Sequence, residues 1–234
     1  MNAPSMQFLY GDRELRLVIG SVLEAPVEVV VNAADAMLSH GGTLARELQT
    51  RAGQALRRES VQLIREYGAI GAGMAVYSTA GELPFKAVIH AVGPALEPSG
   101  SEAGAEDGQR EIEQAVSRSL QLCELNEWRS VAFPALGAEV FDVPIEVCAR
   151  AYFRAITRFW DARHECPLEQ VIVCLREAQF RPFFDAFREH GLDPDNAPAA
   201  GEDAADERPT GEIELSDRDI AALEDDDEID DWFK

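Results

Sequence analysis

Apolar runs and amphipathic stretches alternate along most of this chain. Four runs rich in valine, isoleucine and alanine are typical of strands buried on both faces, and they lie at 29–31, 86–92, 130–136 and 170–175. Shorter segments of alternating polarity predict three further strands, at 7–10, 15–19 and 74–79.

Between these strands, apolar residues recur at helical spacing. The spacing predicts helices over 44–65, 112–123, 145–160 and 180–190. We expect Gly53 to interrupt the first of them, and Gly191 with Pro194 to stop the last. The segment 97–109, rich in Gly, Ser and Glu, is expected to be an exposed loop. Strands that alternate with helices predict an α/β fold with a largely parallel, covered sheet.

The valine run at 29–31 ends in a polar elbow, 32–35, rather than in an ordinary turn. Ser39, His40 and two glycines follow, and a helical pattern then begins. Glycines let backbone N–H groups approach a ligand closely, and a helix N-terminus adds positive potential. These features predict an anion-binding site. Because ligands of such sheets lie beyond the carboxyl ends of the strands, the turn at 137–141 is expected to contribute to the same site.

The net charge of the chain limits the classes of partner that it can bind. The chain of 234 residues has a net charge of −22, of which −14 falls in residues 193–234 and −8 in residues 1–192. Neither part has the basic stripe that duplex DNA or RNA requires, so we expect no direct binding of nucleic acid. No apolar stretch is long enough to span a bilayer and no leader-like segment opens the chain, so we expect no membrane contact and a cytoplasmic location.

The four cysteines have no C-x-x-C spacing. Cys123, Cys148 and Cys174 lie within apolar patterns, which favours buried free thiols over metal ligands or disulfides. We therefore expect no metal and no cofactor.

Four segments, in this order, resemble the macrodomain family of ADP-ribose binders: 29–34 (VVVNAA), 40–45 (HGGTLA), 88–94 (VIHAVGP) and 130–137 (SVAFPALG). The resemblance implies a three-layer α/β/α fold with a mixed, largely parallel central sheet, formed by residues 1–192. In the family, the first glycine loop and a second loop after the Phe-Pro-Ala strand hold the diphosphate, and an Asn-Ala-Ala-Asn elbow contacts the distal ribose. An aspartate in a Gly-Asp-Ile turn binds the adenine amino group, and an aromatic residue of the second loop lies over the ribose.

The resemblance implies twelve ligand-binding residues here: Ser21, Asn32, Asp35, His40, Gly41, Gly42, Thr43, Gly137, Ala138, Glu139, Val140 and Phe141. Some of them depart from the family pattern. Ser21 replaces the adenine-binding aspartate, so any hydrogen bond it accepts lacks charge-assisted strength. Asp35 replaces the second asparagine of the elbow, and Thr43 replaces the third glycine of the first loop.

The second loop departs furthest from the family. Glu139 replaces a glycine whose N–H faces phosphate, and Asp142 replaces a later glycine. A carboxylate about 5 Å from a phosphate oxygen costs roughly 1–3 kcal/mol at an intermediate dielectric. The sequence therefore predicts binding of ADP-ribose or a related nucleotide diphosphate, free or on a protein, that these acidic residues weaken.

Some macrodomains hydrolyse ADP-ribosyl esters with an aspartate after the first glycine loop, and Ala45 occupies the matching position. His40 and His90 belong to a residue type that serves as a general base. However, His90 lies within a buried strand and is better explained as a core residue. We therefore expect no catalytic residue, and an ADP-ribosyl hydrolase is kept as an alternative to a binding module.

Residues 193–234 form an acidic tail, of which 196–210 is expected to be disordered. Ser216, with an acid three residues later, resembles a capping box and predicts a short C-terminal helix. The tail closes with acids around Trp232 and Phe233, and so resembles the docking tips of single-strand DNA-binding proteins. Three interpretations stay open: a solvated tail, a tail that folds back onto arginines of its own domain, or the contact with a basic protein partner in a macrodomain that has lost its ligand.

Overall fold

Seven strands form one mixed sheet in the computed structural model, which describes residues 5–94, 102–138, 143–190 and 192, with the backbone alone at 102–105. The strands are β1 (Ser5–Tyr10), β2 (Arg13–Ile19), β3 (Val29–Ala34), β4 (Ala75–Thr79), β5 (Ala87–Val92), β6 (Ser130–Pro134) and β7 (Gln170–Leu175). Their order in space is β1-β2-β7-β6-β3-β5-β4. The five inner strands run parallel and the two edge strands pair antiparallel. The largely parallel sheet is thus confirmed.

This order brings the carboxyl ends of four neighbouring strands to one edge of the sheet. Ile19 of β2 pairs with Leu175 of β7, and Pro134 of β6 pairs with Cys174 of the same strand. β3 lies on the other side of β6 and ends at Ala34. The segments that follow β2, β7, β6 and β3 therefore start next to one another.

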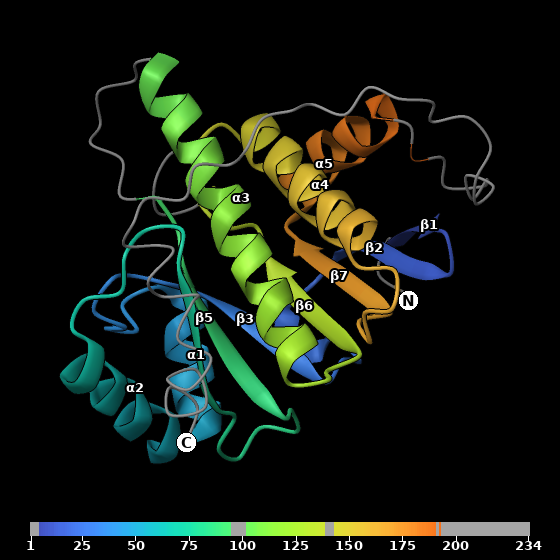
Figure 1. The fold of residues 1–234 in the computed structure, drawn as a ribbon. Helices are drawn as coiled ribbons and strands as arrows, with labels where there is room; N and C mark the ends of the chain where they lie inside the picture. Colours follow the sequence, from blue (N-terminus) through green and yellow to red (C-terminus); the bar gives the residue numbers. More distant parts are fainter. Residues whose placement is uncertain (1–4, 95–101, 139–142, 191, 193–234) are drawn as a thin grey trace. The chain divides into compact units, whose positions relative to one another are not determined.

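Helices cover both faces of the sheet, which makes a three-layer α/β/α fold. The helices are α1 (Thr43–Ala52), α2 (Gln54–Tyr67), α3 (Glu102–Leu125), α4 (Ile145–Ala162) and α5 (Glu177–Glu189), with a 3₁₀ turn, η1, at Val22–Glu24. Successive strand residues point to opposite faces. Val30 belongs to a core cluster with Leu48 of α1, whereas Phe133 meets Tyr152 of α4 with ring centroids 5.8 Å apart. Figure 1 shows α3 and α4 side by side across the sheet.

The predicted helix 44–65 is two helices, and the break lies at Gly53 as expected. Gly53 has φ of 74°, a conformation that L side chains rarely adopt, and it separates α1 from α2. A Cβ atom at this position would lie 2.9 Å from Oε1 of Glu82. Because the exposed Glu82 side chain can move aside, the backbone conformation is what requires a glycine at the break.

The predicted loop 97–109 is wrong for most of its length, because α3 already begins at Glu102. The polar residues of this segment suit a helix start, since acidic groups near a helix N-terminus interact favourably with the helix dipole. Side-chain pairs along the helix add to this: Asp107 pairs with Arg110 at 2.9 Å, and Gln109 donates to Glu113 at 2.9 Å. Residues 97–101 lie outside the described residues.

All of these elements belong to one compact unit, Met1–Ala199. Residues 193–234 are outside the described residues, so the division into a 1–192 domain and an acidic tail stays a prediction. Cys123, Cys148 and Cys174 are buried free thiols, as expected. Among the helices that the structure describes, none has the length and apolarity needed to cross a membrane.

Candidate functional site

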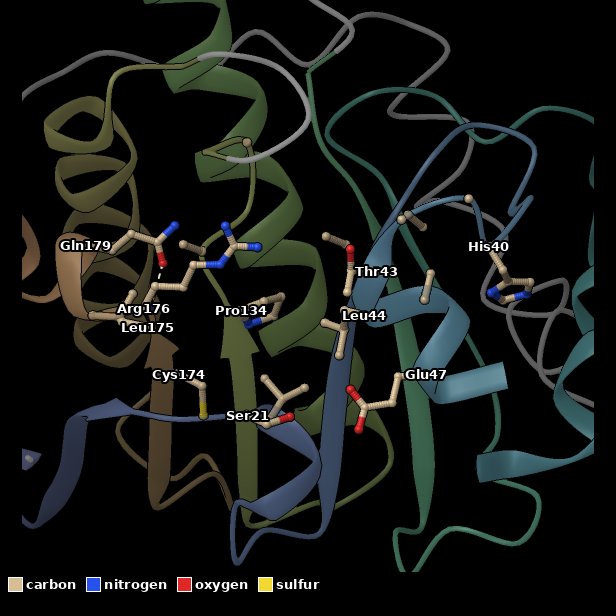
Figure 2. A pocket seen from close by; sticks show the side chains of 18 of the residues that line it. Ser21, His40, Thr43, Leu44, Glu47, Pro134, Cys174, Leu175, Arg176 and Gln179 are labelled. Carbon is tan, nitrogen blue, oxygen red and sulfur yellow. Dashed lines mark hydrogen bonds between the residues drawn. The ribbon is translucent and has the colours of Figure 1, made fainter. Parts of the chain in front are cut away.

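An open cleft of about 240 Å³ lies where β2, β3, β6 and β7 end (Figure 2). Its volume is just below the roughly 300–1,000 Å³ of typical small-molecule sites. Seven of the twelve predicted site residues line it: Ser21, Asp35, His40, Gly41, Gly42, Thr43 and Gly137. Asn32 and Ala138 are not among the lining residues, and Glu139, Val140 and Phe141 lie outside the described residues.

The N-terminus of α1 opens into this cleft without a cap. Gly42 is the N-cap residue, no side chain among the described residues caps the helix, and its first turn holds no acidic residue. The first N–H groups of a helix lack intrahelical partners, which makes a helix N-terminus suited to binding an anion. A Cβ atom at Gly42 would meet nothing within 4 Å, and φ is −73° there. Neither packing nor backbone conformation explains this glycine, whereas close approach of a ligand does.

Gly137 is a glycine for a different reason. Its φ is +83°, and a Cβ atom there would lie 2.7 Å from Cδ1 of Ile112. This residue is therefore required by the turn after β6, whether or not a ligand is bound. Its neighbour Ala138 is half-buried outside the cleft lining.

Asp35 is held by its own loop. Its carboxylate accepts hydrogen bonds from the Met37 N–H at 2.8 Å, the Ser39 N–H at 3.2 Å and the Ser39 hydroxyl at 2.5 Å. Burial, the largest influence, raises the pKa of Asp35, but the hydrogen bonds from Ser39 and Met37 together bring it below its ordinary value. The carboxylate keeps some acceptor capacity for a ribose hydroxyl, while its main contacts shape the loop.

Ser21 lines the cleft just after the end of β2. Its hydroxyl oxygen accepts a hydrogen bond from the Leu23 N–H at 3.2 Å and so caps η1. One lone pair of the oxygen is therefore engaged, and the other stays available to a ligand.

His40 combines an unusual backbone with a buried ring. Its φ is 55° and its exposed fraction is 6%. Nε2 lies 3.0 Å from the Ser60 hydroxyl, which itself donates to the Leu56 carbonyl at 2.9 Å. Because that hydroxyl proton is engaged, Nε2–H of His40 must be the donor to Ser60, and Nδ1 is an acceptor. Burial lowers the pKa of His40, so the ring is neutral at pH 7.

Asn32 lies in the core behind the cleft rather than in its lining. It is 1% exposed, and Nδ2 lies 3.3 Å from Nδ1 of His90. The partner of this amide is therefore a side chain of the parallel strand β5. His90 is fully buried and also contacts the Ser78 hydroxyl at 2.9 Å, which agrees with its expected role as a core residue.

Two buried acceptors in this region have no hydrogen-bond partner among the described residues: Oδ1 of Asn32 and Nδ1 of His40. The rings of His40 and His90 lie 5.7 Å apart, edge to face. Of these groups only His40 lines the cleft, whereas Asn32 and His90 lie in the core.

Three polar residues of the cleft were not predicted from the sequence: Glu47, Arg176 and Gln179. Arg176 directly follows β7, so the rule that ligands lie beyond strand ends would have selected it. Gln179 accepts a hydrogen bond from the Arg176 backbone N–H at 2.9 Å, a contact drawn in Figure 2. Glu47 lies on α1 and reaches Arg51 at 3.5 Å. No sequence pattern distinguishes Glu47 from other helical glutamates, because packing of the domain decides which face of α1 turns toward the cleft.

A family model for the macro domain matches residues 31–152, which is more than half of the chain. This chain belongs to the macrodomain family. Its curated relatives include an O-acetyl-ADP-ribose deacetylase of Klebsiella pneumoniae, 35% identical over 162 residues that cover 69% of this chain and 89% of the relative. A deacetylase of the same name from Salmonella typhimurium is 34% identical and covers 77% of this chain and 97% of its own length.

Solved structures support the same macrodomain fold. The Oceanobacillus iheyensis macrodomain with ADP superposes with a TM-score of 0.71 at 22% identity, over 81% of this chain and 98% of that one. The expected fold class is thus confirmed.

Proposed function

We propose that this macrodomain binds ADP-ribose, free or attached to a protein, in the cleft at the carboxyl edge of its sheet. The observation that carries the proposal is the N-terminus of α1, which no described side chain caps, beside Gly42, a glycine that neither packing nor backbone conformation requires. Such a terminus suits a diphosphate. Relatives named O-acetyl-ADP-ribose deacetylase, and a Trypanosoma brucei macrodomain solved with ADP-ribose, point to the same ligand.

We expect the glycine loop to hold the diphosphate and Asp35 and His40 to lie near a distal ribose. Ser21 also lines the cleft, and the family resemblance expects the base near it. Weakening of the site by Glu139 and Asp142 stays part of the proposal. Isothermal titration of the full chain with ADP-ribose tests it: saturable heat supports binding, and no heat at millimolar ligand refutes it.

A second candidate is the hydrolysis named for the bacterial relatives. Ala45 removes the aspartate that the family resemblance associates with this reaction, but the Glu47 carboxylate lines the same cleft and favours the candidate. Release of acetate from O-acetyl-ADP-ribose by the full chain, lost in Glu47→Gln, would establish it. No release above the uncatalysed rate would leave binding as the function.

The basic protein partner predicted for the acidic tail is tested independently. A pull-down with the full chain and with a variant lacking residues 212–234 compares the proteins retained. Loss of a partner in the shortened variant supports a tail-mediated contact, and identical sets of partners refute it.

A further inference from the structure

Charge presents a difficulty for a diphosphate in this cleft. The chain has a net charge of −22, and two described lining residues, Asp35 and Glu47, are carboxylates. His40 adds no positive charge at neutral pH, because burial lowers its pKa. A diphosphate brings two further negative charges, and like charges in a confined site repel. Backbone N–H groups offset only part of this repulsion, since a helix N-terminus supplies about half an elementary charge.

Arg176 is the one arginine or lysine among the described residues that line the cleft. Figure 2 shows its side chain extending from the end of β7 toward the middle of the cleft, on the side that faces Thr43. Its guanidinium therefore lies across the cleft from the first glycine loop and the N-terminus of α1.

The backbone of Arg176 is fixed at both its polar groups. Its N–H donates to Oε1 of Gln179 at 2.9 Å, and the Gln179 N–H donates to its carbonyl at 3.0 Å. β7 is anchored on one side by β2 and on the other by β6. The side chain thus starts from a rigid point while the residue stays exposed, as suits a group that meets a ligand arriving from solvent.

We propose that Arg176 is a ligand-binding residue whose guanidinium pairs with the diphosphate, opposite the amides of the first glycine loop. This inference rests on the proposed function. It adds to backbone recognition a side-chain cation on the far wall of the cleft, and it makes affinity in an acidic protein depend on one arginine. A guanidinium suits this role because it forms two parallel hydrogen bonds to phosphate oxygens.

The test is titration of the full chain with ADP-ribose at several salt concentrations. Arg176→Gln is expected to weaken binding about tenfold at low salt, as the loss of one charge-assisted contact does. It should also flatten the dependence of affinity on salt, because the screened attraction is gone. Arg176→Lys keeps the charge and should retain the salt dependence with a smaller loss. Arg58→Gln, an equal charge change at an exposed position on α2, is the control and should bind as the wild type does.

The outcomes separate the two proposals. If the wild-type chain gives no heat with ADP-ribose, the proposed function fails. If the wild type binds and Arg176→Gln binds equally well, only the role of Arg176 is refuted. Weaker binding of Arg176→Gln with an unchanged salt dependence would also refute it, because that result places the arginine on an uncharged part of the ligand. Thermal unfolding at the wild-type temperature would exclude misfolding as the cause.

Discussion

Replacement of Gly42 by serine should separate folding from binding. The position has ordinary backbone angles, φ −73° and ψ 164°, and open space where the Cβ atom would lie. Serine is a better N-cap than glycine by a few tenths of a kcal/mol, and loss of glycine freedom in the unfolded chain adds about 0.4–1 kcal/mol. We expect Gly42→Ser to unfold about 1–6 °C higher than the wild type, given roughly 2–4 °C per kcal/mol for a domain of this size.

Binding should change in the opposite direction. The new side chain occupies the approach to the α1 N-terminus, and its hydroxyl competes for the N–H groups that a phosphate would use. Loss of one hydrogen bond to a charged ligand is about 1.5–3 kcal/mol, which corresponds to roughly ten- to hundredfold weaker ADP-ribose binding. Calorimetric titration measures the affinity, and a thermal melt followed by circular dichroism measures the stability.

Gly68→Ser is the matched control. Gly68 has φ of +78°, a Cβ atom there would meet nothing within 4 Å, and the residue does not line the cleft. A serine at this position costs about 1–3 kcal/mol of stability through backbone strain and should leave affinity unchanged. If Gly42→Ser binds ADP-ribose as tightly as the wild type, the assignment of the anion site to the α1 N-terminus is refuted.

Three further predictions concern the core, the acid range and the second loop. Burial, and then the nearby His40 ring, lowers the pKa of His90 from 6.5 to about 3, so stability is full above pH 6.5 and falls as pH drops toward 3. The loss at pH 5 is about 2 kcal/mol, and urea unfolding of His90→Asn should show a flatter pH dependence. The buried Arg13 side chain, 7% exposed, donates hydrogen bonds to the backbone carbonyls of residues 160, 163 and 164 at 3.1, 2.6 and 2.9 Å. Arg13→Met should therefore lower the free energy of unfolding, measured by chemical denaturation, by about 3 kcal/mol. Glu139→Gly should strengthen ADP-ribose binding in calorimetry by about tenfold or more, and an unchanged affinity would show that this carboxylate does not face phosphate.

Local sequence determined the elements that are buried on both sides. The valine run of β3 and the apolar run of β5 indicate strands that are covered on both faces. Parallel strands of this kind are connected by helices, so the runs also predict the layered fold. Gly53 marked the break between α1 and α2 correctly, since a positive φ is a property of one residue and its neighbours. The start of α3 was missed because helix and loop compositions overlap in a polar segment, and its helical pairs appear only once the helix forms.

The glycine loop of the candidate site could also be predicted from the sequence, because a glycine pair before a helix is a local signal of an anion site. What only the tertiary structure decided is which distant side chains share that site and which do not. The Asn32 side chain contacts His90 of the neighbouring parallel strand in the core. Arg176 lines the same cleft as the glycine loop, although it lies more than a hundred residues further along the chain. Sheet order brings these residues together, and that order is set by packing of the whole domain rather than by any short stretch of chain.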